Sequence, residues 1–271
     1  MILFDTHCHL QDDAFGGEFD SVVERARRAG VRGMTLCGYD APSNLTALVL
    51  SETVEGVFPT VGYHPHDAKD LTPEALATLA VQAALPRVVG IGEIGLDFYR
   101  DHSPQDVQRS ALDAQLALAI QVAKPVSLHT RGAEEAIYHQ LVAYGDASPL
   151  RALGRPPGVM HCFGGTLEQA RRYVDLGFLI SIPCAVTYPR NSEARRIAAE
   201  LPLESLVIET DSPYLPPQGM RGQRNEPANV GAAAQSIADA RGTSLEAVAY
   251  QTTENACRLW GVRVGEAAGV A

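Results

Sequence analysis

Short apolar runs rich in β-branched residues recur along the chain and alternate with segments of helical spacing. The runs predict eight strands, at residues 2–5, 31–37, 57–61, 88–91, 125–128, 158–160, 178–182 and 206–208. Between them, apolar residues recur three and four positions apart, as in Phe19, Val22, Val23 and Ala26 ahead of Gly30, which is suited to end a helix. Repeated strand-helix units predict an α/β fold whose parallel sheet closes into a (β/α)8 TIM barrel. A doubly wound α/β sheet is the alternative architecture.

The length of the chain agrees with this architecture. Its 271 residues match the typical barrel size of about 250 residues, and no low-complexity linker divides it. We therefore expect residues 1–271 to form a single domain. Two further segments of helical character, near residues 227–241 and 252–260, are expected to pack outside the barrel.

Composition and charge limit the expected cellular location and binding partners of the protein. The net charge of −10 argues against a broad basic surface for nucleic acid, so any contact with phosphates is expected to be local, with metal ions supplying positive charge. No apolar run is long enough to cross a membrane, and the first residues lack the basic character of a signal peptide. These features predict a cytoplasmic protein without a membrane partner. The five cysteines are scattered and odd in number, and we expect free, mostly buried thiols.

Residues with metal-binding side chains follow several of the predicted strands. His7 and His9 alternate directly after the first strand, so both imidazoles face the same side. The other candidates close the fourth, fifth, sixth and eighth strands, and they are Glu93, His129, His161 and Asp211. In a barrel these strand ends meet on one face, where the active sites of this fold lie. The pattern therefore predicts one site at that face.

The six candidate ligands are more than one tetrahedral ion binds. They suit two divalent ions a few ångströms apart. Glu93 is the expected bridge between them. The remaining ligands are expected to be His7, His9 and Asp211 for one ion, and His129 and His161 for the other. Such a centre activates water against phosphate esters or amides, and Asp211 is the candidate general base. The residue types fit Mg²⁺, Mn²⁺ or Zn²⁺.

Several segments resemble the signature blocks of one family of nucleases. In chain order they are DTHCHL at residues 5–10, GYHP at 62–65, GEIGLD at 92–97, HCFGG at 161–165, ETDSPY at 209–214 and RNEP at 224–227. Their content and order resemble those of the TatD family of metal-dependent deoxyribonucleases, within the amidohydrolase superfamily.

The resemblance implies a TIM-barrel hydrolase that uses Mg²⁺ or Mn²⁺ to trim single-stranded DNA from its 3′ end. It implies the same metal ligands as the residue pattern, namely His7, His9, Glu93, His129, His161 and Asp211. It adds His64 as a further active-site histidine that contacts substrate, beside the catalytic Glu93 and Asp211, and it suggests that Arg131 and Arg224 hold a phosphate. Gly164 departs from the family, which usually has serine there; this removes a hydrogen bond near the substrate but no ligand.

Some of these residues have a second interpretation. Arg131 and Arg224 can form surface ion pairs, and His64 can be a polar strand end bonded to the backbone. Asp97 is either a further metal ligand or, in the interpretation we favour, an acceptor that orients a histidine. The residues expected outside the site, as surface, buried or supporting groups, are His66, His102, His139, Cys8, Cys162 and Glu209.

Three other functions compete with a nuclease. Residues 90–95 match the G-x-G-x-x-G pattern of dinucleotide-binding proteins, but we expect a loop after them up to about Pro104, where that pattern requires a helix. A deacylase of D-aminoacyl-tRNA, or another ester or amide hydrolase, would use the same metal centre, and both this activity and a nuclease acting on DNA or RNA agree with the sequence. A binding protein with an inactive site is disfavoured because all the proposed ligands are present.

Overall fold

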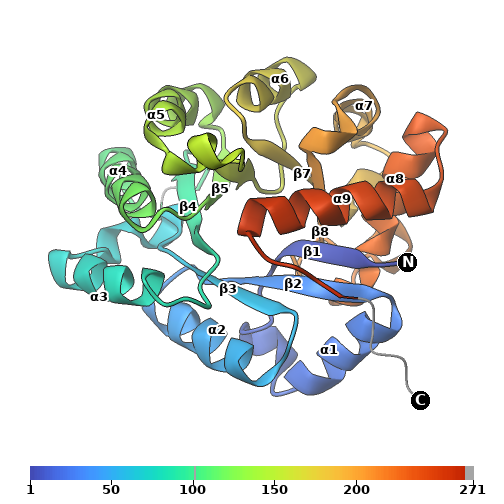
Figure 1. The fold of residues 1–271 in the computed structure, drawn as a ribbon, viewed down its shortest axis with the longest axis horizontal. Helices are drawn as coiled ribbons and strands as arrows, with labels where there is room; N and C mark the ends of the chain where they lie inside the picture. Colours follow the sequence, from blue (N-terminus) through green and yellow to red (C-terminus); the bar gives the residue numbers. More distant parts are fainter. Residues whose placement is uncertain (101, 266–271) are drawn as a thin grey trace.

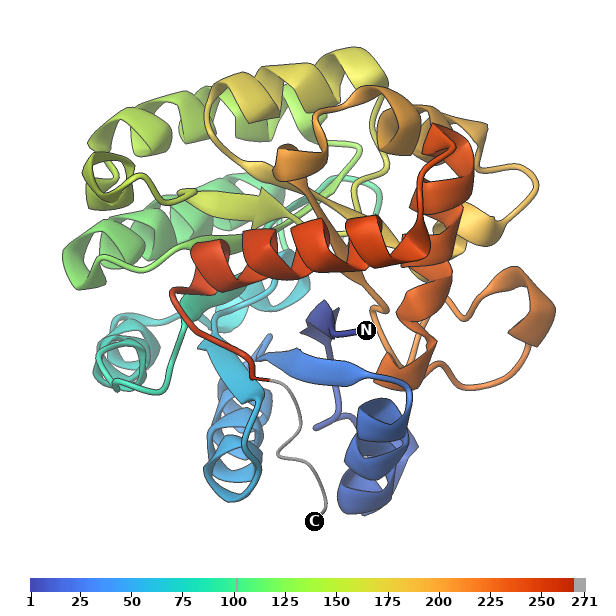
Figure 2. The same cartoon turned by 45° about the vertical axis from the view of Figure 1, so that its right-hand side comes forward.

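Eight parallel strands form one sheet whose order follows the chain from β1 to β8 (Figure 1 and Figure 2). The structure is a computed structural model and describes residues 1–100 and 102–265. Its strands are β1 (Leu3–Cys8), β2 (Val31–Cys37), β3 (Val57–Val61), β4 (Gly90–Asp97), β5 (Val126–Arg131), β6 (Gly158–Met160), β7 (Leu179–Pro183) and β8 (Leu206–Glu209). Its α-helices are α1 (Phe19–Arg28), α2 (Ala41–Thr53), α3 (Pro73–Ala83), α4 (Gln105–Val122), α5 (Glu134–Ala147), α6 (Leu167–Asp175), α7 (Ser192–Glu200), α8 (Gly231–Arg241) and α9 (Leu245–Trp260).

Backbone hydrogen bonds join the two ends of the sheet. The N–H of Asp211 donates to the carbonyl of His7 at 3.0 Å, and the N–H of His9 donates to the carbonyl of Ser212 at 2.7 Å. These bonds hold the segment after β8 beside β1 and close the sheet into a barrel. The predicted TIM barrel is confirmed, and the doubly wound alternative is wrong.

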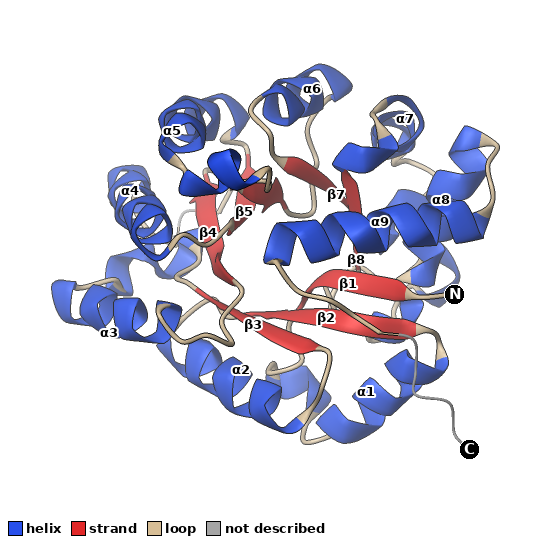
Figure 3. Ribbon diagram, viewed as in Figure 1, coloured by secondary structure: helices blue, strands red, loops and turns tan. Residues whose placement is uncertain are grey.

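Helices surround the strands (Figure 3), and buried apolar residues of the helices and strands form one core cluster. The apolar residues that predict the first helix, Phe19, Val22, Val23 and Ala26, are all buried in α1. Gly30 follows with φ +91°, a left-handed conformation that glycine adopts without a steric penalty. Within the described part of the chain, no helix combines the length and apolar character needed to cross a membrane.

The last helix closes the amino-terminal end of the barrel. Figure 2 shows α9, in red, running across the barrel instead of joining the ring of helices. Its Ala256, Leu259 and Trp260 pack against apolar side chains near the strand starts, namely Phe4, Val89, Val159, Leu179 and Val207. This helix lies outside the closed sheet, as expected, and covers its end, because the apolar strand starts need a cover that excludes water. The carboxyl ends of the strands remain as the face for a site.

The strand β4 extends further than the sequence predicts. The expected strand stops at residue 91 with Glu93 closing it, but β4 continues to Asp97 and contains Glu93 in its middle. Gly92 and Gly95, which are typical of loops, here allow close approach of β5. A Cβ added to Gly95 would lie 1.9 Å from the carbonyl oxygen of His129. The whole G-x-G-x-x-G segment is strand, and α4 begins only after a loop, so the helix required for dinucleotide binding does not follow these glycines.

Candidate metal centre

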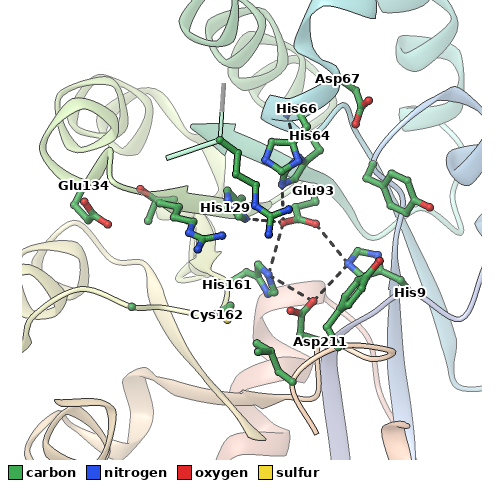
Figure 4. Close-up of a pocket in the computed structure, with 17 residues that line it drawn as sticks. His9, His64, His66, Asp67, Glu93, His129, Glu134, His161, Cys162 and Asp211 are labelled. Carbon is green, nitrogen blue, oxygen red and sulfur yellow. Dashed lines mark hydrogen bonds and ion pairs between the residues drawn. The ribbon is translucent and has the colours of Figure 1, made fainter. Parts of the chain in front are cut away.

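The predicted ligands converge at the carboxyl ends of the strands, and Figure 4 shows all of them except His7. They are His7 of β1, Glu93 of β4 and His129 of β5, with His9, His161 and Asp211 just after β1, β6 and β8. All but His7 line a cavity of about 810 Å³, and His7 is fully buried beside them. The barrel thus brings all six side chains together.

Glu93 stands at the centre of the cluster, with one carboxylate oxygen toward each half. Its Oε2 lies 3.4 Å from His7 Nε2 and 3.6 Å from His9 Nε2. Its Oε1 lies 3.1 Å from His129 Nδ1 and 3.6 Å from His161 Nε2. A carboxylate whose two oxygens face separate groups of imidazoles suits the role of a bridge between two cations.

Asp211 lies within reach of both halves. Its Oδ1 is 3.6 Å from His9 Nε2 and 3.9 Å from His161 Nε2. With His7 and His9 it offers three ligand atoms that all lie within 4.8 Å of one another. The grouping of Asp211 with His7 and His9 therefore agrees with the geometry, and its carboxylate also borders the space beside His161.

Hydrogen bonds at Nδ1 leave the Nε2 atoms of two histidines free to bind a cation. His9 Nδ1 lies 2.8 Å from the carbonyl oxygen of Cys37, which can only accept, so the neutral ring carries its proton there. His161 Nδ1 lies 3.0 Å from Glu209 Oε2, which selects the same tautomer. Each Nε2 then offers a lone pair beside the carboxylates of the cluster, the donor set that divalent metals bind. The residues present therefore fit a metal centre.

Buried carboxylates make the cluster attractive to cations. Burial lowers the pKa of His161, but the charges of Glu209, Glu93 and Asp211 outweigh it and raise the pKa to about 10. Burial alone raises the pKa of Glu93, yet the surrounding histidines hold that pKa well below its usual range. The same field that favours a proton on His161 favours a divalent cation at its Nε2.

Glu209, expected from the sequence to be a supporting group, contacts His161. It is buried in β8, and its carboxylate accepts from His161 Nδ1 at 3.0 Å and from the N–H of Cys162 at 2.6 Å. A carboxylate in this position fixes the orientation of a ligating imidazole and raises its basicity.

Replacing Glu209 by Gln is expected to weaken metal binding by about 10- to 100-fold, the usual effect of losing the partner of a ligating histidine. The amide keeps the volume of the side chain but lacks the negative charge that favours cation binding at His161. Calorimetric titration of metal-free protein with Mn²⁺ measures the change. An unchanged affinity would show that Glu209 does not act through His161.

Asp97 connects His129 to a second histidine. Its Oδ2 lies 3.2 Å from His129 Nε2 and 2.9 Å from His66 Nε2, while its Oδ1 accepts two backbone N–H groups from the loop after β4. Both oxygens are therefore engaged by donors. This geometry supports the interpretation of Asp97 as the acceptor that orients His129, with His129 Nδ1 directed to Glu93.

His66 belongs to the pocket, although its position in the sequence predicts a surface or loop histidine outside the site. It lines the cavity and bonds to Asp97. Its spacing of two residues from His64 repeats the spacing of His7 and His9, and this signal could have revealed it. The other histidines expected outside the site, His102 and His139, are exposed.

His64 is oriented as a hydrogen-bond donor. Its Nδ1 accepts the N–H of His66 at 3.1 Å, so the neutral ring carries its proton on Nε2. Burial lowers the pKa of His64 well below its usual range despite the nearby charge of Glu93. The Nε2 atom lies 3.6 Å from Glu93 Oε1, at the edge of the cluster. This arrangement suits donation to a substrate better than ligation of a metal.

The two predicted phosphate-binding arginines lie in different places. Arg131 lines the cavity, and its guanidinium stacks 4.0 Å above the ring of Tyr99. Arg224 lies away from the cavity wall, and its guanidinium binds Glu18 at 3.0 Å and Glu226 at 2.9 Å. The donors of Arg224 are engaged by carboxylates, and this geometry favours the ion-pair alternative over a phosphate-binding role.

Arg100 and Cys162 line the cavity although the sequence analysis assigns neither to the site. Arg100 follows β4 in a loop, where no motif position distinguishes it. Alternation along a strand predicts that Cys162 points away, but β6 ends at Met160 and Cys162 has φ +43°, so alternation does not apply. Cys8 is buried as predicted, with its thiol donating to a carbonyl of β2. All five cysteines are free.

Comparison with known proteins identifies relatives over nearly the whole chain. The profile of the family described as TatD related DNase matches residues 4–261. The uncharacterized metal-dependent hydrolase YabD of Bacillus subtilis is 38% identical over 259 residues, covering 96% of this chain and 99% of its own. The 3'-5' ssDNA/RNA exonuclease TatD of Klebsiella pneumoniae is 37% identical, covering 97% and 99%. The crystal structure of the TatD homologue YjjV from Escherichia coli superimposes with a TM-score of 0.89 at 32% identity, covering 96% of this chain and 98% of its own.

Proposed function

The chain belongs to the TatD family of metal-dependent hydrolases, and from this premise we propose that it shortens single-stranded DNA or RNA from the 3′ end. The observation that carries the proposal is the position of Glu93, because its two carboxylate oxygens face separate groups of histidines. Such a centre can hold two cations against one phosphodiester. The activity named for the Klebsiella relative, a 3'-5' ssDNA/RNA exonuclease, supports the choice of substrate.

Each side chain has a proposed role in this reaction. The proposed metal ligands are His7, His9, Glu93, His129, His161 and Asp211, which suit Mg²⁺, Mn²⁺ or Zn²⁺. Divalent ions bound there would supply positive charge to the attacked phosphate and acidify water. Asp211 takes the proton of the attacking water as general base. Burial raises the pKa of Asp211, but the hydrogen bond with His9 and the charges of nearby histidines outweigh burial and lower it, so the carboxylate is ionised at neutral pH. His64 donates its Nε2–H to a phosphate oxygen.

The charges of the cavity favour a free strand end over a long contact with the backbone. Among its described lining residues, the lysines and arginines are Arg100 and Arg131 alone, beside the carboxylates Asp67, Glu93, Glu134 and Asp211. Binding through many phosphates needs many cationic side chains. A flexible single strand can instead bring its last phosphodiester to the metal centre. Gly164 also lines this space, and a Cβ there would meet no atom within 4 Å, so the glycine leaves room where the family usually has serine.

Shortening of a 5′-labelled single-stranded oligonucleotide tests the proposal. With Mn²⁺ or Mg²⁺ we expect a ladder of products that lose nucleotides from the 3′ end, abolished by a chelator. A blunt duplex and a circular single strand of the same sequence are the controls, and both should be cut slowly. Equal cutting of the circular strand would refute the exonuclease proposal. Hydrolysis confined to a D-aminoacyl-tRNA ester would identify the deacylase alternative instead.

Arg131 and Arg224 form a matched pair for a test of phosphate binding. Replacing Arg131 by Ala is expected to lower kcat/KM for the oligonucleotide by about 10- to 100-fold, because a hydrogen bond between charged groups is lost. The Arg224→Ala variant should change kcat/KM little, since that guanidinium binds Glu18 and Glu226. Both rates are measured under saturating Mn²⁺. The assignment of Arg131 fails if the two variants lose activity equally.

A further inference from the structure

The two sides of the cavity differ in chemistry. Tyr39 follows β2, and Tyr214 and Leu215 follow β8, so these lining residues stand over the segment of the barrel around β1. Arg100 and Arg131 lie after β4 and at the end of β5. Because the strand order of the closed barrel follows the chain, β1 faces β5 across the barrel. A substrate that spans the metal centre therefore meets an aromatic wall on one side and, on the other, a wall with two arginines and the carboxylate of Glu134.

The aromatic wall adjoins the proposed metal ligands. The ring centroid of His9 lies 5.4 Å from that of Tyr39 and 6.4 Å from that of Tyr214. Tyr214 Oη donates to Asp12 Oδ2 at 3.2 Å, which ties the ring to the loop after β1. Although Tyr214 lines the cavity, it is 54% exposed, so a large part of its surface is available to a ligand. An accessible aromatic ring beside a phosphodiester site is the feature on which a nucleobase stacks.

The charges on the two walls of the cavity indicate which part of a single-stranded nucleic acid fits each wall. Carboxylates adjoin the aromatic wall: Asp12 accepts the hydrogen bond of Tyr214, and Asp40 follows Tyr39 in the chain. Their negative charges disfavour a further phosphate but accept an uncharged nucleoside. Every further nucleotide of the strand brings another phosphate, and Arg100 and Arg131 offer positive charge on the opposite side.

We propose that Tyr214 and Tyr39 form the subsite for the base of the 3′-terminal nucleoside, on which Tyr214 stacks, while the rest of the strand leaves past Arg100 and Arg131. This proposal rests on the exonuclease function proposed above and specifies how the substrate is oriented. It explains why the wall nearest His9 is aromatic and carries no arginine or lysine among its described residues. It also requires a terminal nucleoside without a 3′-phosphate, because that group would enter the negative field near Asp12.

Paired substrates and variants test the subsite. The substrates are a single-stranded oligonucleotide with a normal 3′-terminal thymidine and the same oligonucleotide with a terminal abasic residue. For the unaltered protein we expect kcat/KM to be about tenfold higher with the base, which is the scale of one base stacked on an aromatic ring. Tyr214→Ala should abolish this ratio, and Tyr214→Phe should retain it because the ring remains. A 3′-phosphate on the normal oligonucleotide should slow its removal.

Tyr250 provides a matched control. It is 67% exposed on α9, the helix that covers the opposite end of the barrel, so Tyr250→Ala should leave both the rate and the ratio unchanged. The subsite is refuted if Tyr214→Ala slows both oligonucleotides equally and preserves the ratio, since the ring would then act on the metal centre or the fold. If the unaltered protein shortens neither oligonucleotide with Mn²⁺, the proposed exonuclease function is refuted, and the proposed subsite is refuted with it.

Discussion

Glu93→Gln protein is expected to fold normally, to lose most of its bound metal and to show almost no hydrolysis. The two oxygens of Glu93 face His7 and His9 on one side and His129 and His161 on the other. An amide has nearly the same volume, but it lacks the charge and presents an N–H₂ group to one of the two cations. Metal affinity should therefore fall by more than the roughly 10- to 100-fold that follows the loss of a partner of a ligand.

Elemental analysis after dialysis, thermal unfolding and the oligonucleotide assay together measure this effect. The unaltered protein should carry up to two divalent ions per chain, and the variant should carry substantially less at the same free Mn²⁺. Glu134→Gln is the matched control, because Glu134 lines the same cavity but lies outside the cluster of proposed ligands. Retention of both metal and turnover by the Glu93 variant would exclude a bridging role. A large loss of thermal stability in metal-free buffer would show that Glu93 serves the fold.

The barrel could be predicted because the sequence patterns that indicate its strands are local. Each strand is a short apolar run, and the alternation of His7 and His9 directs both imidazoles to one face wherever the strand lies. The candidate ligands from other strands could then be placed together by the closure of the fold alone. This is why the sequence led to the whole cluster around Glu93, although the expected end of its strand was wrong. The glycines of β4 resemble a loop in sequence, and only the proximity of β5 explains them.

The surroundings that could not be predicted from the sequence depend on contacts between distant segments. Arg224 stands in a motif block, but Glu18, which comes from near the start of the chain, binds its guanidinium. His66 lies beside the site because its ring bonds to Asp97, at the end of β4. The last helix is amphipathic like the others, and nothing in its own residues distinguishes a cover for the end of the barrel from a member of the ring. Such partners are set by tertiary packing, which local patterns do not encode.

Asp211→Asn is expected to separate proton transfer from metal binding. Asparagine retains an oxygen that can ligate, and the remaining proposed ligands are intact, so most of the metal should stay bound under saturating Mn²⁺. The amide cannot accept the proton of the attacking water, and turnover should fall by roughly 10²- to 10⁴-fold, the usual contribution of a general base. Single-turnover cleavage of the labelled oligonucleotide measures this rate without a contribution from product release.

Metal content and turnover, measured for both Glu93→Gln and Asp211→Asn, distinguish the roles of the two carboxylates. Loss of metal together with turnover in the Asp211 variant would assign Asp211 to metal binding, whereas loss of turnover with metal retained would assign it to proton transfer. Asp67→Asn is the matched control, since Asp67 lines the same cavity and has no place in the proposed cluster. Oligonucleotide affinity should be unchanged in the Asp211 variant, because the proposed substrate-binding groups Arg131 and His64 are untouched. Near-normal turnover with metal bound would leave Asp211 without a catalytic role and direct the search for the base to the other groups beside Glu93.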